Sequence, residues 1–118
     1  MKQTITAPWD GRALGEVELA DEGAAERAIV GAEKAFDAVR AMPTHARRDA
    51  LRKIAQTIAA RAEELAELIA NEAGKPLVYA RGEVARAVST FELAAEETSR
   101  VPAGVMPLDI TKTGEGYT

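Results

Sequence analysis

Residues 44–76, THARRDALRKIAQTIAARAEELAELIANEAGKP, form the stretch around which this chain is organised. Its apolar residues recur at steps of three and four, which places them along one stripe of an α-helix. These residues are Leu51, Ile54, Ile58, Ala62, Leu65 and Ile69. The spacing predicts one long helix over 45–73. Because a single apolar stripe must be buried, other helices are expected to cover it.

Both ends of this helix are marked in the sequence. Thr44 follows Pro43, and its hydroxyl is expected to accept a hydrogen bond from a first-turn amide. Gly74 can adopt the left-handed conformation that closes a last turn, and Pro76 cannot extend the hydrogen-bond ladder. Basic residues crowd the first half of the helix and acidic residues the second, which opposes the helix macrodipole. We expect packing to outweigh that small cost.

Two elements are predicted before the long helix. Over residues 5–19, an Asp10-Gly11 turn precedes alternating apolar and polar residues, a pattern typical of a β-hairpin. A helix over about 22–41 follows, with Asp21 as its cap. Alanine-rich faces let helix axes approach closely, so we expect this helix to lie antiparallel against the long one.

Two more elements are predicted after the long helix. A third helix is expected over 77–97, and its two partly apolar faces imply cover on two sides. Leu108 and Ile110 then alternate with polar residues, which predicts a C-terminal strand. No earlier strand is available to pair with it, so its partner is expected outside this chain. The predicted fold class is therefore mainly α, with three helices, an N-terminal hairpin and a terminal strand.

The composition excludes several classes of function. The chain has 118 residues, of which 47% are hydrophobic, but alanine supplies much of that fraction and large side chains are few. Such a chain has little volume for an independent core. A net charge of −4 argues against nucleic acid as a partner, since phosphate binding needs unneutralised Lys and Arg. With no long apolar run and no signal peptide, a cytoplasmic protein without a membrane segment is expected.

The reactive residue types are scarce. The chain has no cysteine, which removes thiol nucleophiles and thiolate metal sites. His45 is the single histidine and is interpreted as a surface group, so neither a His-based metal cluster nor a serine triad is expected. Gly114-Glu115-Gly116 lacks the further glycine or lysine of a phosphate loop. The sequence therefore predicts no catalytic, cofactor-binding or metal-binding residue in this chain.

Four segments in a fixed order indicate a family. They are PWDGRALGEV at 8–17, AERAIVGAEKAFDAV at 25–39, RRDALRKIAQTIAARAEELAELIANEAGKP at 47–76 and EVARAVSTFELAAEE at 83–97. In this order and spacing the chain resembles the beginning of the NAD(P)-dependent aldehyde dehydrogenase superfamily. The resemblance covers nearly all of the chain. The alternative is a self-contained, non-enzymatic helical module that binds a protein partner through its apolar helix faces.

The resemblance implies an α/β parent enzyme with a Rossmann-like cofactor domain. Residues 1–106 would be the N-terminal part of that domain, and residues 107–118 would begin an arm that joins subunits of a homodimer or homotetramer. The implied reaction oxidises an aldehyde to its acid with NAD or NADP, through a thiohemiacetal on a cysteine beyond this chain. The chain alone would be inactive. A leading segment of this kind is expected to expose apolar surface on its third helix.

Arg86 is the one candidate site residue. Glu83, Val84, Ala85 and Arg86 match an E-V-x-R pattern found in a subset of the family. That subset handles small aldehydes bearing phosphate, phosphonate or a neighbouring hydroxyl, and the resemblance implies that Arg86 binds the anionic group of the substrate. Gly82, one turn earlier, would leave space beside it. The alternative is a surface arginine that pairs with Glu83.

Overall fold

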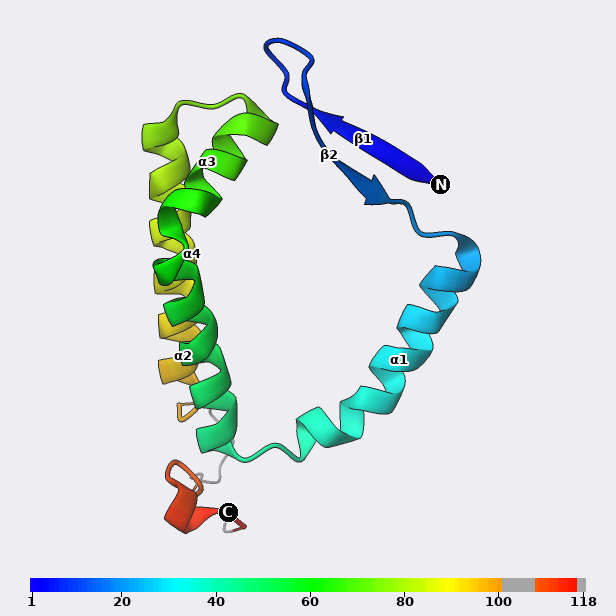
Figure 1. Ribbon diagram of the computed structural model, residues 1–118. Coiled ribbons are helices and arrows are strands. Elements are labelled where there is room, and N and C mark those ends of the chain that lie inside the picture. The colour runs from blue at the N-terminus through cyan, green and yellow to red at the C-terminus, as the bar shows by residue number, and fades with distance from the viewer. Residues whose placement is uncertain (101–107, 117–118) are drawn as a thin grey trace.

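The computed structural model describes residues 1–100 and 108–116 (Figure 1). The predicted fold class is confirmed, because the described residues are mostly helical and carry one antiparallel hairpin. No helix among these residues is long and apolar enough to cross a membrane. The elements are β1 (Lys2–Thr6), β2 (Ala13–Glu18), α1 (Glu22–Arg40), α2 (Thr44–Ala60), α3 (Ala62–Ala73), α4 (Leu77–Glu97) and the 3-10 helix η1 (Lys112–Gly114).

The N-terminal hairpin forms as predicted. Strands β1 and β2 are antiparallel, and Gln3 lies opposite Val17. Gly11 takes a positive φ of 71° in the connection, a conformation that glycine adopts at little cost. The hairpin begins at Lys2, earlier than the predicted residue 5. At its turn end, Ala7 is buried and the Arg12 guanidinium donates to the Asn71 side chain on α3 at 2.6 Å. The hairpin therefore contacts the C-terminal end of α3.

The predicted single helix over 45–73 is wrong at one residue. It divides at Arg61, whose φ of −110° and ψ of 20° separate α2 from α3. The Arg61 amide donates to the Ile58 carbonyl at 3.1 Å, a 3-10 type bond that tightens the turn. The division places Glu63 and Glu64 in the first turn of α3, where carboxylates are favoured by the helix dipole. The prediction of one continuous helix placed these two glutamates where they oppose the helix dipole. In the structure they lie at the favourable end of α3.

The core lies where α4 packs against both α2 and α3. Its buried centre is Ala66, Ala80 and Val84, with partly buried apolar side chains packed around it. The surrounding residues are Ile58, Leu65, Ile69, Ala70 and Leu77. Because alanine occupies the points of closest approach, the helix backbones come near one another and no buried side chain in the described residues is larger than valine.

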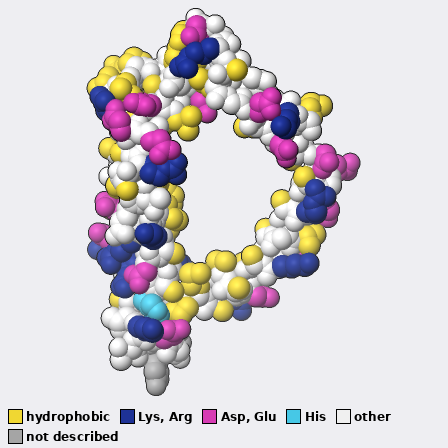
Figure 2. All heavy atoms as spheres, viewed as in Figure 1, with side chains coloured by type: hydrophobic (Ala, Val, Ile, Leu, Met, Phe, Trp, Pro, Cys, Tyr) yellow, Lys and Arg dark blue, Asp and Glu magenta, His cyan; other side chains and the backbone are white. Residues whose placement is uncertain are grey.

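The predicted antiparallel packing of α1 against the long helix is wrong. Helix α1 has no buried residue and stands away from the other helices (Figure 1). Its apolar face is exposed, with Ile29 and Phe36 both more than 60% accessible, and hydrophobic side chains are visible along it (Figure 2). The physical reason is that α4 occupies the apolar stripe of α2 and α3, so α1 finds no free face on them.

The predicted C-terminal strand is also wrong for the described residues. Residues 108–116 form turns and the short helix η1, and this segment lies against the start of α2 (Figure 1). Its backbone is held there by α2, since the His45 amide donates to the Asp109 carbonyl at 3.1 Å and Arg48 donates to the Ile110 carbonyl at 2.9 Å. Without a second strand to pair with, these carbonyls find donors on the helix instead.

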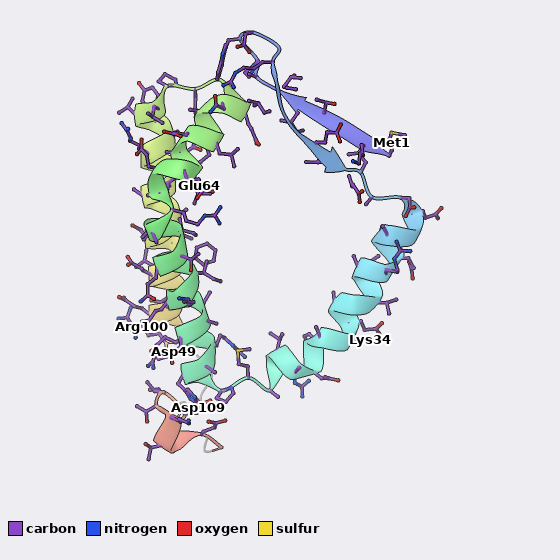
Figure 3. All side chains as sticks on the ribbon, in the orientation of Figure 1. Met1, Lys34, Asp49, Glu64, Arg100 and Asp109 are labelled. Atoms are coloured by element: carbon purple, nitrogen blue, oxygen red, sulfur yellow. The ribbon has the colours of Figure 1, made fainter. Side chains whose placement is uncertain are left out.

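Asp109 supplies the helix cap that Thr44 was expected to provide. Asp109 lies beside the start of α2 (Figure 3). The Thr44 amide donates to the Asp109 carboxylate at 2.7 Å, whereas no side chain at the boundary residue Pro43 caps the helix. A carboxylate at this position satisfies one of the orphaned first-turn amides and meets the positive end of the helix dipole. The cap therefore comes from a residue 65 positions away in the sequence.

The Asp109 cap is expected to weaken in acid. Hydrogen bonding from the Thr44 side chain, and then from its backbone amide, lowers the pKa of Asp109 below its ordinary value of 3.8. A carboxylate whose pKa is lowered by folding stabilises the folded state at pH values above its ordinary pKa. This stabilisation is lost as the pH falls through the lowered pKa of the folded state. We expect the Thr44 amide resonance to shift between about pH 5 and pH 2, with a midpoint below 3.8. Two-dimensional NMR titration measures this shift, and Asp109→Asn should abolish it. A midpoint above 3.8 would contradict the assignment.

Candidate functional site

The candidate site is an open groove between α4 and the α2–α3 pair. It has a volume of about 570 Å³. Helices α2 and α3 contribute Ile58, Leu65 and Ile69, and α4 contributes Glu83, Val84, Arg86, Ala87 and Thr90. Most of the lining is aliphatic, because the groove runs beside the buried alanine contact of the core. Its size and its few polar groups are typical of a site for a small organic molecule.

Arg86 supplies the positive charge of this groove. It lies near the middle of α4, where its side chain is exposed and reaches the groove lining. The groove therefore combines aliphatic walls from α2 and α3 with one guanidinium. A guanidinium keeps its charge at any physiological pH and can hold a carboxylate or phosphate through two parallel hydrogen bonds. This arrangement suits a molecule with a short apolar body and an anionic end.

The surface pairing of Arg86 with Glu83 is not formed. Glu83 instead pairs with Lys75, whose ammonium nitrogen lies 2.6 Å from the carboxylate. The Lys75 hydrogen bond lowers the pKa of Glu83, and the charges of Lys75 and Arg86 add to that lowering. Among the ion pairs of residues 1–100 and 108–116, none includes Arg86. The guanidinium is therefore free of carboxylate partners in the described part of the chain.

Gly82 leaves open space, as expected, but outside the groove. A Cβ added at Gly82 would meet no atom of the described residues within 4 Å. The residue does not belong to the groove lining. The use of this space by a ligand stays a prediction.

The Gly114-Glu115-Gly116 segment does not form a phosphate-binding loop. Gly114 belongs to η1, and a Cβ there would collide with the Leu108 carbonyl, so this glycine serves close packing of the backbone. A three-residue 3-10 helix offers no row of free amides for a pyrophosphate. Nor does any cluster of three His, Asp or Glu side chains in these ranges suit a metal ion.

The interpretation of His45 as a surface group is wrong, because most of its side chain is buried. Its side chain is only 14% exposed, with Nδ1 3.3 Å from the Asp109 carbonyl and Nε2 3.6 Å from the Glu115 carboxylate. Both partners come from the C-terminal segment, more than 60 residues away. No local pattern could have found these contacts, because they depend on where that segment folds back.

Comparison with known proteins places this helical segment in a class of enzymes. Residues 1–118 match the Aldehyde dehydrogenase family over their whole length. The chain belongs to this family. An aldehyde-dehydrogenase-like protein of Sinorhizobium fredii is 38% identical over 105 residues, which are 89% of this chain and 20% of that protein. The family assignment confirms the predicted resemblance and favours the enzyme over the helical interaction module.

Two solved structures show the same arrangement. Aldehyde dehydrogenase 21 of Physcomitrella patens, in complex with its product succinate, matches with a TM-score of 0.86 and 34% identity, over 98% of this chain and 24% of that one. Glyceraldehyde-3-phosphate dehydrogenase of Methanocaldococcus jannaschii, in complex with NADP, matches with a TM-score of 0.78 and 34% identity, over 80% and 21%. The chain thus spans between a fifth and a quarter of the length of these proteins.

Proposed function

We propose that this chain is the leading segment of an aldehyde dehydrogenase that oxidises a small anionic aldehyde to its carboxylic acid with NAD or NADP. Arg86 holds the anionic group of the substrate. The reacting cysteine, which forms the thiohemiacetal, lies beyond these residues, since the chain itself contains none. A nicotinamide cofactor accepts the hydride in such an enzyme. The segment alone is inactive.

The observation that carries this proposal is an uncompensated guanidinium at an aliphatic groove. Arg86 lines the groove, while the carboxylate that could neutralise it, Glu83, is held by Lys75. A small aldehyde with a terminal anion can place its carbon chain against Ile58 and Ile69 and its charge on Arg86. Fixing the far end of the substrate orients the aldehyde without taking part in the chemistry.

The two structural relatives support an anionic substrate. One is a glyceraldehyde-3-phosphate dehydrogenase, whose substrate name includes a phosphate. The other was crystallised with succinate, which carries a second carboxylate besides the one produced by oxidation. In both molecules the extra anion is separated from the reacting carbon by a short chain. The NADP in the first complex supports a nicotinamide cofactor for this family.

The proposal also covers the domains and subunits of the intact enzyme. Residues 1–106 belong to the N-terminal part of a Rossmann-like cofactor domain, and residues 107–118 begin the arm that joins subunits into a homodimer or homotetramer. The apolar faces exposed on α1 and α4 support this, because Ile29, Phe36, Tyr79 and Leu93 need cover that the described residues do not supply. A cytoplasmic location fits the composition.

Arg86→Leu in the intact enzyme tests the assignment. We expect kcat/KM for succinate semialdehyde to fall about tenfold or more, mostly through KM, because a charged hydrogen-bonded contact is worth roughly 1.5–3 kcal/mol. Butanal, which has the same number of carbons and no charge, should change less than about twofold. Steady-state kinetics with both aldehydes measures the ratio of kcat/KM for succinate semialdehyde to kcat/KM for butanal.

A matched variant guards against a general effect of losing a positive charge. Arg52→Leu removes an exposed arginine from α2 that does not line the groove, and it should leave the ratio between the two aldehydes unchanged. Equal losses with succinate semialdehyde and butanal in Arg86→Leu would remove Arg86 from substrate binding.

A further inference from the structure

Glu83 lies between two cations that compete for it. Lys75 stands in the turn between α3 and α4, and Arg86 follows Glu83 by three positions on α4. A glutamate and an arginine at this spacing are neighbours on a helix surface and attract each other when both are free. The structure shows Glu83 bound to Lys75 instead, at 2.6 Å. The Glu83 carboxylate therefore pairs with Lys75 and not with Arg86.

Among the ion pairs of residues 1–100 and 108–116, Lys75–Glu83 is the pair in which both side chains are well under half exposed. Its side chains are 32% and 36% exposed, whereas each of the other pairs has a member that is half or more exposed. Partial burial reduces screening by water and salt, which strengthens the attraction. Glu83 also lines the groove, so its partner decides the charge that the groove presents.

The backbone holds Lys75 in place for this contact. Gly74 closes α3 in the left-handed conformation with φ of 65°, and Pro76 is the boundary residue of α4 with φ of −57°. The backbone of Lys75, which lies between these two residues, is therefore restricted. Less conformational entropy is therefore lost when the ion pair forms.

We propose that Lys75 is a positioning residue for the substrate. By pairing with Glu83 it prevents Glu83 from neutralising Arg86, and so keeps the guanidinium available to the anionic end of the aldehyde. This inference rests on the function proposed above, since it matters only if Arg86 binds that anion. Without Lys75, the carboxylate turns to Arg86 and competes with the substrate for it.

The test is Lys75→Met in the intact enzyme, assayed with succinate semialdehyde and butanal. We expect KM for succinate semialdehyde to rise about fivefold with kcat retained, and KM for butanal to change less than about twofold. Adding Glu83→Gln to Lys75→Met removes the competing carboxylate and should restore KM for succinate semialdehyde. Lys75→Arg keeps the charge and should behave like the parent enzyme.

Two further variants separate positioning from stability. Lys2→Met breaks the exposed Lys2–Glu16 pair of the hairpin and should leave the ratio of the two KM values unchanged. Glu83→Gln alone removes the anion beside Arg86, so KM for succinate semialdehyde should stay the same or fall. This single variant decides the question even if Lys75→Met fails to fold, because a rise in that KM overturns the proposal.

The outcomes distinguish this inference from the proposed function. If Arg86→Leu is selective for the anionic aldehyde but Lys75→Met is not, Arg86 keeps its role and the inference about Lys75 falls. If the double variant remains as impaired as Lys75→Met, the competition between Glu83 and the substrate is also refuted. If Arg86→Leu affects both aldehydes equally, the proposed function and this inference fall together.

Discussion

Replacing Ala80 with leucine is expected to lower the free energy of unfolding by about 3 kcal/mol, the largest effect anticipated for a single substitution in this chain. Ala80 is fully buried, as is Ala66, and both belong to the cluster where α3 meets α4. A leucine adds three carbon atoms at a point where no space is left. The helices must then separate or the side chain must leave its preferred rotamers, and either change is costly. Urea unfolding followed by far-UV circular dichroism measures the loss.

The matched control for this prediction lies on the same helix. Ala85 is exposed on α4, so Ala85→Leu adds the same three carbons without meeting a packed neighbour. Its effect should stay within about 0.5 kcal/mol, because surface substitutions away from special features are nearly neutral. Similar losses for Ala80→Leu and Ala85→Leu would show that α4 does not pack through Ala80.

Replacing Gly74 with alanine is expected to lower the free energy of unfolding by about 2 kcal/mol, from two separate causes. The residue has φ of 65°, a left-handed conformation that an L side chain resists. A Cβ there would also lie 2.7 Å from the Pro8 side chain, at the turn end of the hairpin. The substitution therefore strains the end of α3 and pushes the hairpin away from it. Urea unfolding gives the total loss, and NMR shifts of the hairpin report its displacement.

Gly82 is the control for Gly74→Ala, because it has neither a positive φ nor a neighbour that an added Cβ would meet. It lies inside α4 with no described atom within 4 Å of an added Cβ. Alanine is favoured over glycine in a helix interior by roughly 1 kcal/mol, so Gly82→Ala should raise the stability. If Gly74→Ala also raised it, the left-handed cap and the Pro8 contact would both be wrong.

The elements that the sequence predicted well are those with signals inside a short window. The bounds of α4 match the prediction of 77–97, and α1 begins directly after its predicted cap, Asp21. The Asp21 carboxylate accepts from the Ala24 amide at 2.7 Å, as an N-cap does. The hairpin turn at Gly11 has the positive φ that its Asp-Gly sequence indicated. For the Asp21 cap and the Gly11 turn, the determining residues lie within four positions of one another.

Two of the wrong predictions, the packing of α1 and the C-terminal strand, depended on residues far apart in the sequence. The break at Arg61 has no proline or glycine to mark it, and both halves of the interrupted helix still pack against α4. The strand expected around Leu108 was read from alternation alone. The structure instead makes Asp109 the cap of α2, a contact that no window of sequence contains. A sequence motif identified Arg86 as a candidate site residue, but only the structure shows that Glu83 pairs with Lys75.

The sequence by itself therefore determined the bounds of α4, the start of α1, where the hairpin turns and the family to which the chain belongs. Periodicity, caps and glycine positions act through neighbouring residues, so they can be read directly. Tertiary structure alone decided that α4 rather than α1 covers the long helical stretch, that Asp109 closes the start of α2, and that no carboxylate of the described residues pairs with Arg86. These outcomes follow from competition among distant groups for the same faces, donors and charges, which no local pattern records.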